Sequence, residues 1–179
     1  MKKIICIVGM PGSGKTYAAN ALAKKYKVRV IHSGDVIREE IKRKGLKYSP
    51  HTDAVIAHWF HTQGRDKFVV ERIWKKARNS KKKMVVIEGF RSKMEVNYLE
   101  KLSEVKPIVI AIIAPLEIRI KREIKRGRFG KEESTEYIKS RDKLEISHGI
   151  KKLIEKADYK IDNSKTDADK KILKLIRKV

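Results

Sequence analysis

Short apolar runs alternate along this chain with longer segments in which apolar residues recur at helical spacing. The apolar runs are rich in β-branched residues and are flanked by turn residues, a pattern that predicts strands. These strands lie at residues 3–8, 27–32, 84–87, 107–113 and 157–163. Most of the runs are almost continuously apolar, which is typical of strands buried on both faces. The pattern therefore predicts an α/β fold, with a mostly parallel five-stranded sheet and helices on both faces.

The segments between the strands predict helices. These helices lie at residues 17–25, 35–45, 52–62, 66–78, 97–102, 116–126, 132–148 and 167–178. We expect a single domain, because 179 residues suit one core and no linker or low-complexity segment divides them. Its core would comprise residues 1–34, 80–114 and 149–179, with a helical insert at about 35–79 and a short lid region at about 115–148.

The segment GMPGSGKT, at residues 9–16, satisfies G-x-x-x-x-G-K-[ST] at every fixed position and connects a predicted strand to a predicted helix. Glycines let such a loop turn sharply and aim N–H groups at phosphate oxygens beside a helix N-terminus. A glycine-rich turn that binds nothing is the alternative, but the complete motif in this context favours phosphate binding. We therefore expect ATP and Mg²⁺ as cofactors, with Lys15 at the β- and γ-phosphates and Thr16 at the metal. The predicted ATP-binding residues of the loop are Gly9, Pro11, Gly12, Ser13, Gly14, Lys15 and Thr16.

The chain carries 45 Lys and Arg residues against 22 Asp and Glu residues, which gives a net charge of +23. Such an excess favours anionic partners, either nucleic acid or a small phosphorylated substrate. The cations are spread over the whole chain, with residues 81–83 as the only tight run. Charge alone therefore does not distinguish a nucleic-acid partner from a small phosphorylated substrate. For the same reason any RNA binding is expected to be weak and sensitive to salt. The abundance of Lys, Arg, Glu and Ile is typical of hyperthermophiles.

Membrane and disulfide chemistry are not expected. No apolar run approaches the roughly 20 residues of a membrane span, and the first predicted strand leaves no room for a signal peptide. Cys6 is the only cysteine, which excludes an intrachain disulfide and a zinc site built from cysteines. These features predict a cytoplasmic protein without a membrane partner.

Polar residues follow the second predicted strand. Ser33 and Asp35 stand at a helix start, and Arg38 lies one turn further on, facing the same way. From spacing alone, Asp35 is equally well explained as a helix cap and Arg38 as a solvated charge. The stretch resembles the Ser-x-Gly-Asp-x-x-Arg segment of adenylate kinase, however, and the resemblance implies that all three residues line an acceptor pocket.

A second motif follows the third predicted strand. Glu88-Gly89-Phe90-Arg91 is similar to the Asp-Gly-Phe-Pro-Arg of adenylate kinases, in which the acid supports the metal and the arginine grips the acceptor phosphate. Here a glutamate replaces the aspartate, and the missing proline brings Arg91 one position closer. The longer acid favours contact with Mg²⁺ through a metal-bound water. The resemblance thus implies a metal role for Glu88 and acceptor binding by Arg91.

Two arginines of the predicted lid form an i, i+4 pair. Arg122 and Arg126 follow Pro115 with a spacing similar to that of the arginines that open the adenylate kinase lid. The resemblance implies that Arg122 packs on the donor base and that Arg126 touches the transferred phosphate, so both are candidate catalytic residues with Lys15 and Asp35. Solvated positions in a chain crowded with cations are the alternative.

Two further stretches complete the resemblance. Arg141-Asp142 resembles the pair that returns from the adenylate kinase lid, which implies acceptor contact by Arg141. Residues 157–163, ADYKIDN, are similar to the Ala-Asp-x-x-Ile-x-Asn close of dephospho-coenzyme A kinases. Taken together, the motifs most resemble an archaeal P-loop family related to adenylate kinase. This resemblance implies the three-layer P-loop NTPase fold.

The same resemblance implies a nucleotide kinase that moves the γ-phosphoryl group of ATP to a small phosphorylated acceptor, of the nucleoside monophosphate or dephospho-coenzyme A type. For a hydroxyl acceptor, Asp35 would be the general base. For a monophosphate, it would only orient metal-bound water and the pocket. The alternative is a nucleic-acid-associated P-loop ATPase that acts on RNA or in ribosome assembly, for which the charge of +23 would be the operative feature.

Histidines and aromatic residues gather in the predicted insert. His58 and His61 share a helical face near His51, but no acidic partner accompanies them at a metal-binding spacing. The aromatic residues at helical spacing are expected in the core, with at most one of them at the substrate. They are Trp59, Phe60, Phe68 and Trp74.

Overall fold

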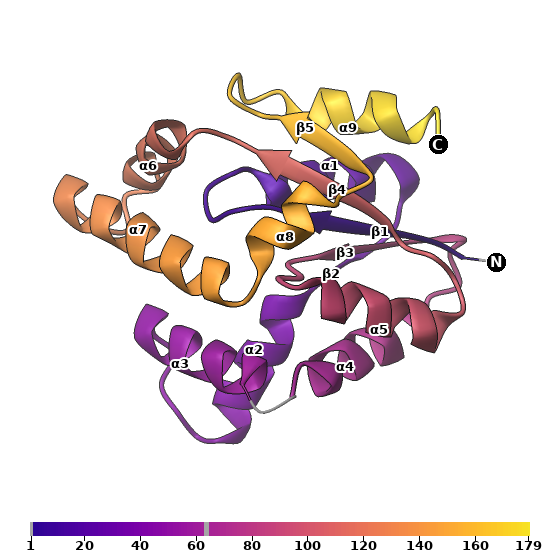
Figure 1. The fold of residues 1–179 in the computed structure, drawn as a ribbon, viewed down its shortest axis with the longest axis horizontal. Coiled ribbons are helices and arrows are strands. Elements are labelled where there is room, and N and C mark those ends of the chain that lie inside the picture. The colour runs from indigo at the N-terminus through magenta and orange to yellow at the C-terminus, as the bar shows by residue number, and fades with distance from the viewer. Residues whose placement is uncertain (1, 63–64) are drawn as a thin grey trace.

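A parallel five-stranded sheet forms the centre of the computed structural model, which describes residues 2–62 and 65–179 (Figure 1). Its strands are β1 (Lys3–Val8), β2 (Val30–His32), β3 (Met84–Glu88), β4 (Ile108–Ile113) and β5 (Tyr159–Asp162). Their order across the sheet is β2-β3-β1-β4-β5, and all four pairings are parallel. The predicted α/β fold with five strands is confirmed.

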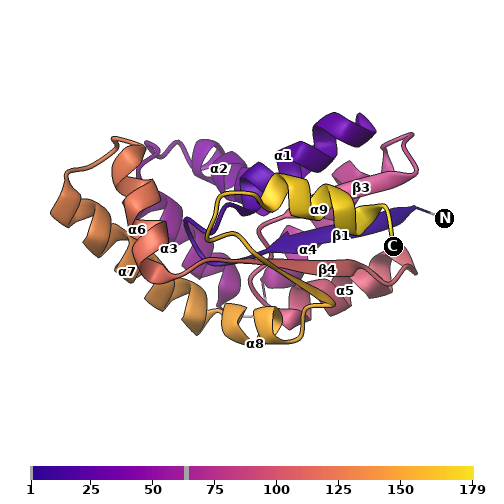
Figure 2. The same cartoon turned by 90° about the horizontal axis from the view of Figure 1, so that it is seen from above.

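Helices cover both faces of the sheet and extend beyond one of its ends (Figures 1 and 2). They are α1 (Lys15–Tyr26), α2 (Ser33–Arg43), α3 (Pro50–His61), α4 (Asp66–Arg78), α5 (Lys93–Ser103), α6 (Leu116–Lys125), α7 (Lys131–Ser147), α8 (Ile150–Glu155) and α9 (Ala168–Ile176). The predicted insert contains α2, α3 and α4, and the predicted lid region contains α6 and α7. None of the helices in the described part of the chain is long and apolar enough to cross a membrane.

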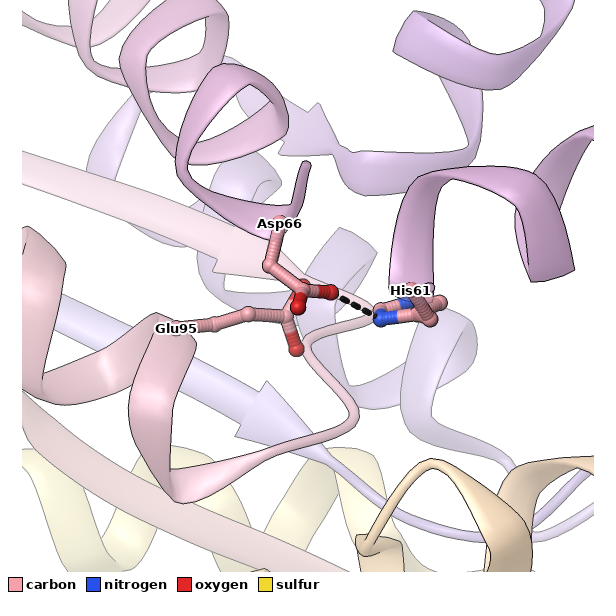
Figure 3. Close-up of side chains that lie close together, drawn as sticks. All are labelled: His61, Asp66 and Glu95. Atoms are coloured by element: carbon pink, nitrogen blue, oxygen red, sulfur yellow. Dashed lines mark ion pairs between the residues drawn. The ribbon is translucent and has the colours of Figure 1, made fainter. Parts of the chain in front are cut away.

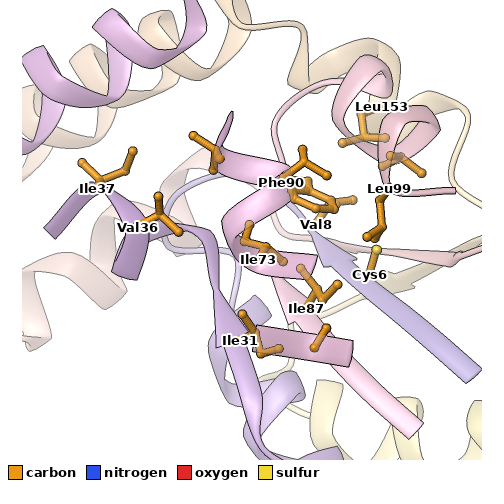
Figure 4. Packing of buried hydrophobic residues seen from close by; sticks show 14 of the residues in the cluster. Cys6, Val8, Ile31, Val36, Ile37, Ile73, Ile87, Phe90, Leu99 and Leu153 are labelled. Atoms are coloured by element: carbon orange, nitrogen blue, oxygen red, sulfur yellow. The ribbon is translucent and has the colours of Figure 1, made fainter. Parts of the chain in front are cut away.

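The sheet separates two apolar clusters because successive side chains of a strand point to opposite faces. Ile5 of β1 packs in the cluster that includes residues of α1 and α9. Cys6 points the other way, into a larger cluster with Ile73 of α4, Leu99 of α5 and Leu153 of α8 (Figure 4). Since the helices of this second cluster belong partly to the insert, the insert is anchored to the sheet by the core itself.

The strand register places the polar ends of three strands side by side. Glu88, the last residue of β3, is paired with Ile7 of β1 on one side and with His32 of β2 on the other. The loop that follows β1 leaves the sheet at this same edge. Parallel α/β sheets bind ligands outside the carboxyl ends of their strands, and the functional residues are therefore expected here.

The predicted elements agree with the structure except at a few boundaries. Helix α8 was not predicted, and β2 is only three residues long because the segment before Val30 does not pair with the sheet. Helix α5 begins at Lys93, four residues earlier than expected, because Ser92 and Glu95 form a reciprocal capping box. Residues 63–64, predicted to separate two helices, lie outside the described residues.

Candidate active site

The loop between β1 and α1 has the backbone conformation that its glycines permit. Gly12 and Gly14 have φ angles of 76° and 96°, in the left-handed region. A Cβ on Gly14 would also collide with the side-chain amide of Asn163, so both the backbone conformation and the available space require glycine here. Within the described residues, the first turn of α1 has no acidic side chain and no side-chain cap. Its N-terminus therefore offers unneutralised N–H groups, as phosphate binding needs.

Glu88 lies at the centre of the site and is buried. Its Oε1 is 3.9 Å from Lys15 Nζ, and its Oε2 is 2.6 Å from His32 Nδ1. Burial by itself would raise the pKa of Glu88, but the hydrogen bonds from His32 and Thr16 and the charge of Lys15 hold it below its usual value. The same hydrogen bond raises the pKa of His32. A charged carboxylate beside the Thr16 hydroxyl is a set of hard oxygen ligands that fits Mg²⁺.

A cavity of about 480 Å³ extends from this centre at the carboxyl edge of the sheet. The glycine loop forms one end, and residues of the insert and the lid region form the other walls. Eight of the polar side chains that line it are Lys15, Thr16, His32, Arg38, Glu88, Arg91, Arg126 and Arg141. The structure thus brings together most of the side chains that the sequence analysis assigned to phosphate groups.

The far wall of the cavity is a chain of ion pairs. Arg91 Nε donates to Glu145 Oε2 at 2.7 Å, and Arg141 donates to Glu145 Oε1 at 2.9 Å and to Asp53 Oδ2 at 3.3 Å. Burial would raise the pKa of Glu145, yet the two arginines lower it to about 2. This wall therefore offers both guanidinium donors and carboxylate acceptors to a bound molecule, so it suits an acceptor with an anionic group and hydroxyl or amino groups nearby.

The residues at the start of α2 divide between two surfaces. Ser33 lines the cavity and donates through its hydroxyl to the carbonyl of Gly89 at 2.7 Å, which connects the start of α2 to the segment after β3. Arg38 also lines the cavity. Asp35 is not among the described residues that line it; its carboxylate accepts a 2.5 Å hydrogen bond from Arg38 and borders a separate hollow beside Val30. Asp35 thus orients Arg38 in this structure.

The two lid arginines, predicted to share one helix face, have different hydrogen-bond partners. Arg126 follows the last turn of α6 and lines the main cavity, where the buried Glu123 accepts hydrogen bonds from it and from Arg128. Arg122 instead lies behind the glycine loop and donates to the carbonyls of Gly12 and Ser13 at 3.3 and 3.2 Å. Arg126 also borders the space beside Arg122, so the two arginines are neighbours there.

A second hollow, of about 310 Å³, opens beside Arg122. Arg122 donates there to the carbonyl of Asn163 and to the hydroxyl of Thr166, and the Asn163 side chain donates to Ser13 at 2.7 Å. The hollow adjoins the glycine loop at Gly12 and Gly14. A donor base stacked near Arg122 would occupy it, and this assignment stays a prediction.

Three residues of metal-ligating type also lie close together: the partly buried His61 and the buried Asp66 and Glu95 (Figure 3). Arg91 Nη1 lies 3.2 Å from His61 Nε2. An arginine only donates, so Nε2 accepts and the proton is on Nδ1, which pairs with Asp66. A metal-bound histidine would donate through its second nitrogen, and the cluster is better explained as a support for Arg91. The sequence analysis found no acidic partner for these histidines. Asp66 is such a partner for His61, but the hydrogen bonding of His61 does not fit a metal site.

Several side chains at the cavity were not predicted from the sequence. They are His32, Tyr48, Asp53, Tyr137 and Glu145. His32 directly precedes the predicted Ser33 and ends a strand, so its position beside the P-loop could have been inferred. The other four lie in the insert and the lid region, where no local pattern shows which side faces the cavity.

Comparisons with known proteins agree with this geometry. Residues 8–145 match a family described as an AAA domain. UPF0200 proteins of Methanosarcina barkeri and Pyrococcus abyssi are 36% and 37% identical to this chain, covering 92% and 98% of it and 88% and 96% of their own lengths. The shikimate kinase of Acinetobacter baumannii, solved in complex with shikimate, has a TM-score of 0.54 at 17% identity, with 99% and 92% of the two chains covered.

The structural likeness shows a shared fold, that of P-loop kinases. The sequence relatives are closer and span nearly the whole chain, and they come from archaea, as the resemblance predicted. This chain therefore belongs to the UPF0200 family of archaeal P-loop proteins.

Proposed function

We propose that this protein transfers the γ-phosphoryl group of ATP to a small nucleotide-like acceptor, with Mg²⁺ bound. The observation that supports the proposal is the single cavity in which the glycine loop, Glu88 and arginines from both the insert and the lid region converge. Catalysis of this kind depends mainly on positioning and on neutralising phosphate charge. ATP is supplied in the cytoplasm, where such a reaction would take place.

At the donor end, Lys15 and Arg126 would hold the transferring group between two positive charges. Thr16 and Glu88 would hold Mg²⁺, which supplies further positive charge against the phosphates. His32 keeps the Glu88 carboxylate oriented through its 2.6 Å contact. The ion pair of Arg126 with Glu123 would have to loosen as the guanidinium moves to phosphate.

At the acceptor end, Arg38, Arg91 and Arg141 would bind the part of the acceptor that does not react. Arg91 is already fixed by Glu145 and His61, so it loses little freedom on binding. Because Asp35 pairs with Arg38 and is not among the described residues that line the cavity, we assign it the positioning of Arg38 rather than the role of general base. The acceptor group that receives the phosphate, a phosphate or a hydroxyl, is left open.

The proposal is tested by an acceptor panel. AMP, CMP, UMP, dephospho-coenzyme A and RNA are each incubated with ATP and Mg²⁺, and ADP formed above the water-only rate is measured. We expect one small acceptor to stimulate ADP formation. Stimulation by RNA alone would support the alternative, an ATPase that acts on nucleic acid.

Lys15→Ala provides the matched test of the site. Removing a charge aimed at the γ-phosphate should lower the transfer rate by about 10²-fold or more, with an unchanged thermal unfolding midpoint. Lys24→Ala, at an exposed position of the same helix, should leave the rate unchanged. Full turnover by a folded Lys15→Ala protein would show that the loop is not the catalytic phosphate site.

A further inference from the structure

A second open hollow, of about 440 Å³, lies on the insert between α2, the end of α3 and the start of α4. Among the described residues, it shares no lining residue with the cavity at the glycine loop. We call it the aromatic–basic hollow; its lining residues are Glu40, Arg43, Trp59, Phe60, Arg65, Phe68 and Arg72. None of these residues has a role in the proposed transfer reaction.

Two aromatic rings of the hollow are exposed, contrary to the expectation that they belong to the core. Trp59 is 36% exposed and Phe68 is 45% exposed, whereas Phe60 between them is buried. Phe60 stacks on Phe68 at 5.8 Å between ring centroids and meets Trp59 edge-on at 4.9 Å. The two exposed rings are therefore held by a core residue, so a flat ligand would find them already ordered.

Cations surround these rings. The Arg65 guanidinium lies 4.2 Å from the centre of the Trp59 ring, Lys44 Nζ lies 5.2 Å from it, and Arg72 lies 5.2 Å from the Phe68 ring. Glu40, the one acid among the described lining residues, is buried, and its two carboxylate oxygens accept hydrogen bonds from Arg43. Arg72 also lies 3.7 Å from the carboxylate of the exposed Glu39 and 3.8 Å from that of Glu40, so its charge is partly offset, and the exposed lining of the hollow is aromatic with a net positive charge.

We propose that the aromatic–basic hollow binds single-stranded nucleic acid, with bases stacked on Trp59 and Phe68 and backbone phosphates near Arg65 and Arg72. Ordered aromatic rings stack on flat bases, and the neighbouring cations attract the phosphates that join them, so no particular base sequence is needed. A second copy of the chain is a poorer occupant, because two molecules of charge +23 repel each other and the acid among the described lining residues, Glu40, is buried.

The test measures the affinity of the full chain for fluorescently labelled 12-residue oligo(U) and oligo(dT) over a series of salt concentrations. Trp59→Ala and Phe68→Ala should each weaken binding about five- to 100-fold, as loss of one stacked base does. Arg65→Ala and Arg72→Ala should each lower the slope of log affinity against log salt by about 0.7. Met94→Ala, which removes an equally exposed apolar side chain from α5, should change neither quantity.

Trp59→Lys separates stacking from simple charge attraction. It adds a cation at the hollow, so a purely electrostatic surface would bind the oligonucleotides more tightly, whereas the proposal expects weaker binding. In a Trp74→Phe background Trp59 is the only tryptophan, and stacking should quench its fluorescence on saturation. Stronger binding of oligo(U) than of oligo(dT), or the reverse, supports the proposal and identifies RNA or DNA as the source.

Three results would overturn the proposal. The first is unchanged affinity of the folded Trp59→Ala and Phe68→Ala proteins, and the second is tighter binding by Trp59→Lys. The third is the absence of oligonucleotide binding together with dimerisation in sedimentation experiments that Trp59→Ala abolishes, which would assign the hollow to self-association. Each result is independent of phosphoryl transfer, because none of the residues described at the hollow also lines the cavity.

Discussion

Single arginines at opposite ends of the cavity should differ in their kinetic effects. Arg38 is proposed to bind the unreactive part of the acceptor, where its contribution is nearly the same in the ground and transition states. Arg38→Ala should therefore raise the acceptor KM about tenfold, with a smaller change in kcat and an unchanged KM for ATP. Arg126→Ala should lower kcat about 10²-fold and leave the acceptor KM almost unchanged, because its contact forms with the transferring group.

Steady-state kinetics with each substrate varied in turn measures both effects. Arg29→Ala, at an exposed position before β2, is the control and should behave as the wild type. If Arg38→Ala weakens ATP binding and spares the acceptor, the assignment of the two ends is wrong.

For single residues, the sequence predicted the positions that are set by the local chain and missed the positions that are set by how helices pack. Lys15 and Thr16 follow from their place in a loop whose backbone sets their direction. Asp35 is also at its predicted helix start, but which face of α2 meets the cavity depends on how the helix packs. Glu145 is more than 50 residues from Arg91 and reaches it only through the fold. No local pattern could reveal that pair.

Helices α6 and α7 are linked to the glycine loop by one buried side chain. Arg119 of α6 donates to both carboxylate oxygens of Asp142 in α7, at 2.7 and 2.6 Å, and to the carbonyl of Pro11 at 3.0 Å. Both side chains of the ion pair are largely buried. The orientation of the lid region relative to the phosphate site therefore depends on this pair.

Asp142→Ala should lower the free energy of unfolding by about 3 kcal/mol, because it leaves the buried Arg119 charge without its partner. Urea denaturation measures the loss. The double variant Arg119→Met with Asp142→Leu should recover much of it, since no buried charge is then uncompensated. A double variant no more stable than Asp142→Ala would show that the geometry of the pair, rather than charge burial, sets the stability.

Elements were predicted well where hydrophobic period and end signals agree. Helix α4 has the predicted bounds, and the predicted strand at 107–113 differs from β4 by one residue. Helix α8 was missed because its six residues are too few to show a helical period, and it is held instead by Ile150 and Leu153 in the core. Short elements are defined by tertiary packing, which the linear pattern does not contain.

Across the whole molecule, the insert, the lid region and the core meet at a group of histidines. The His58 and His148 rings make a 3.4 Å nitrogen–nitrogen contact between α3 and the end of α7. The His61 and His148 rings stack with centroids 4.2 Å apart, beside Arg91. Protonation of His148 would place a positive charge among these groups, so acid should weaken the junction that closes the far side of the cavity.

The pH dependence of stability should show this. Burial, together with His61 and Arg91, lowers the pKa of His148 from 6.5 to about 3. Between these values the unfolded chain binds a proton that the folded chain does not, so stability is highest above pH 6.5 and falls as the pH is lowered. The pKa of Glu145, lowered from 4.5 to about 2, adds a further loss only below pH 4.5. Burial raises the pKa of Glu95, which works in the opposite direction just above pH 4.5, so the share of His148 is found by comparing variants over the interval between pH 6.5 and 4.5.

His148→Gln should accordingly flatten the fall in thermal unfolding midpoint between pH 6.5 and 4.5, because the variant has no imidazole to protonate at this position. His51→Gln removes an exposed histidine near the start of α3 and should retain the wild-type slope. Comparing slopes rather than absolute midpoints cancels the general repulsion of a chain with charge +23, which grows with acid in all three proteins. Equal slopes for His148→Gln and the wild type would mean that the histidine junction does not control the acid sensitivity of the fold.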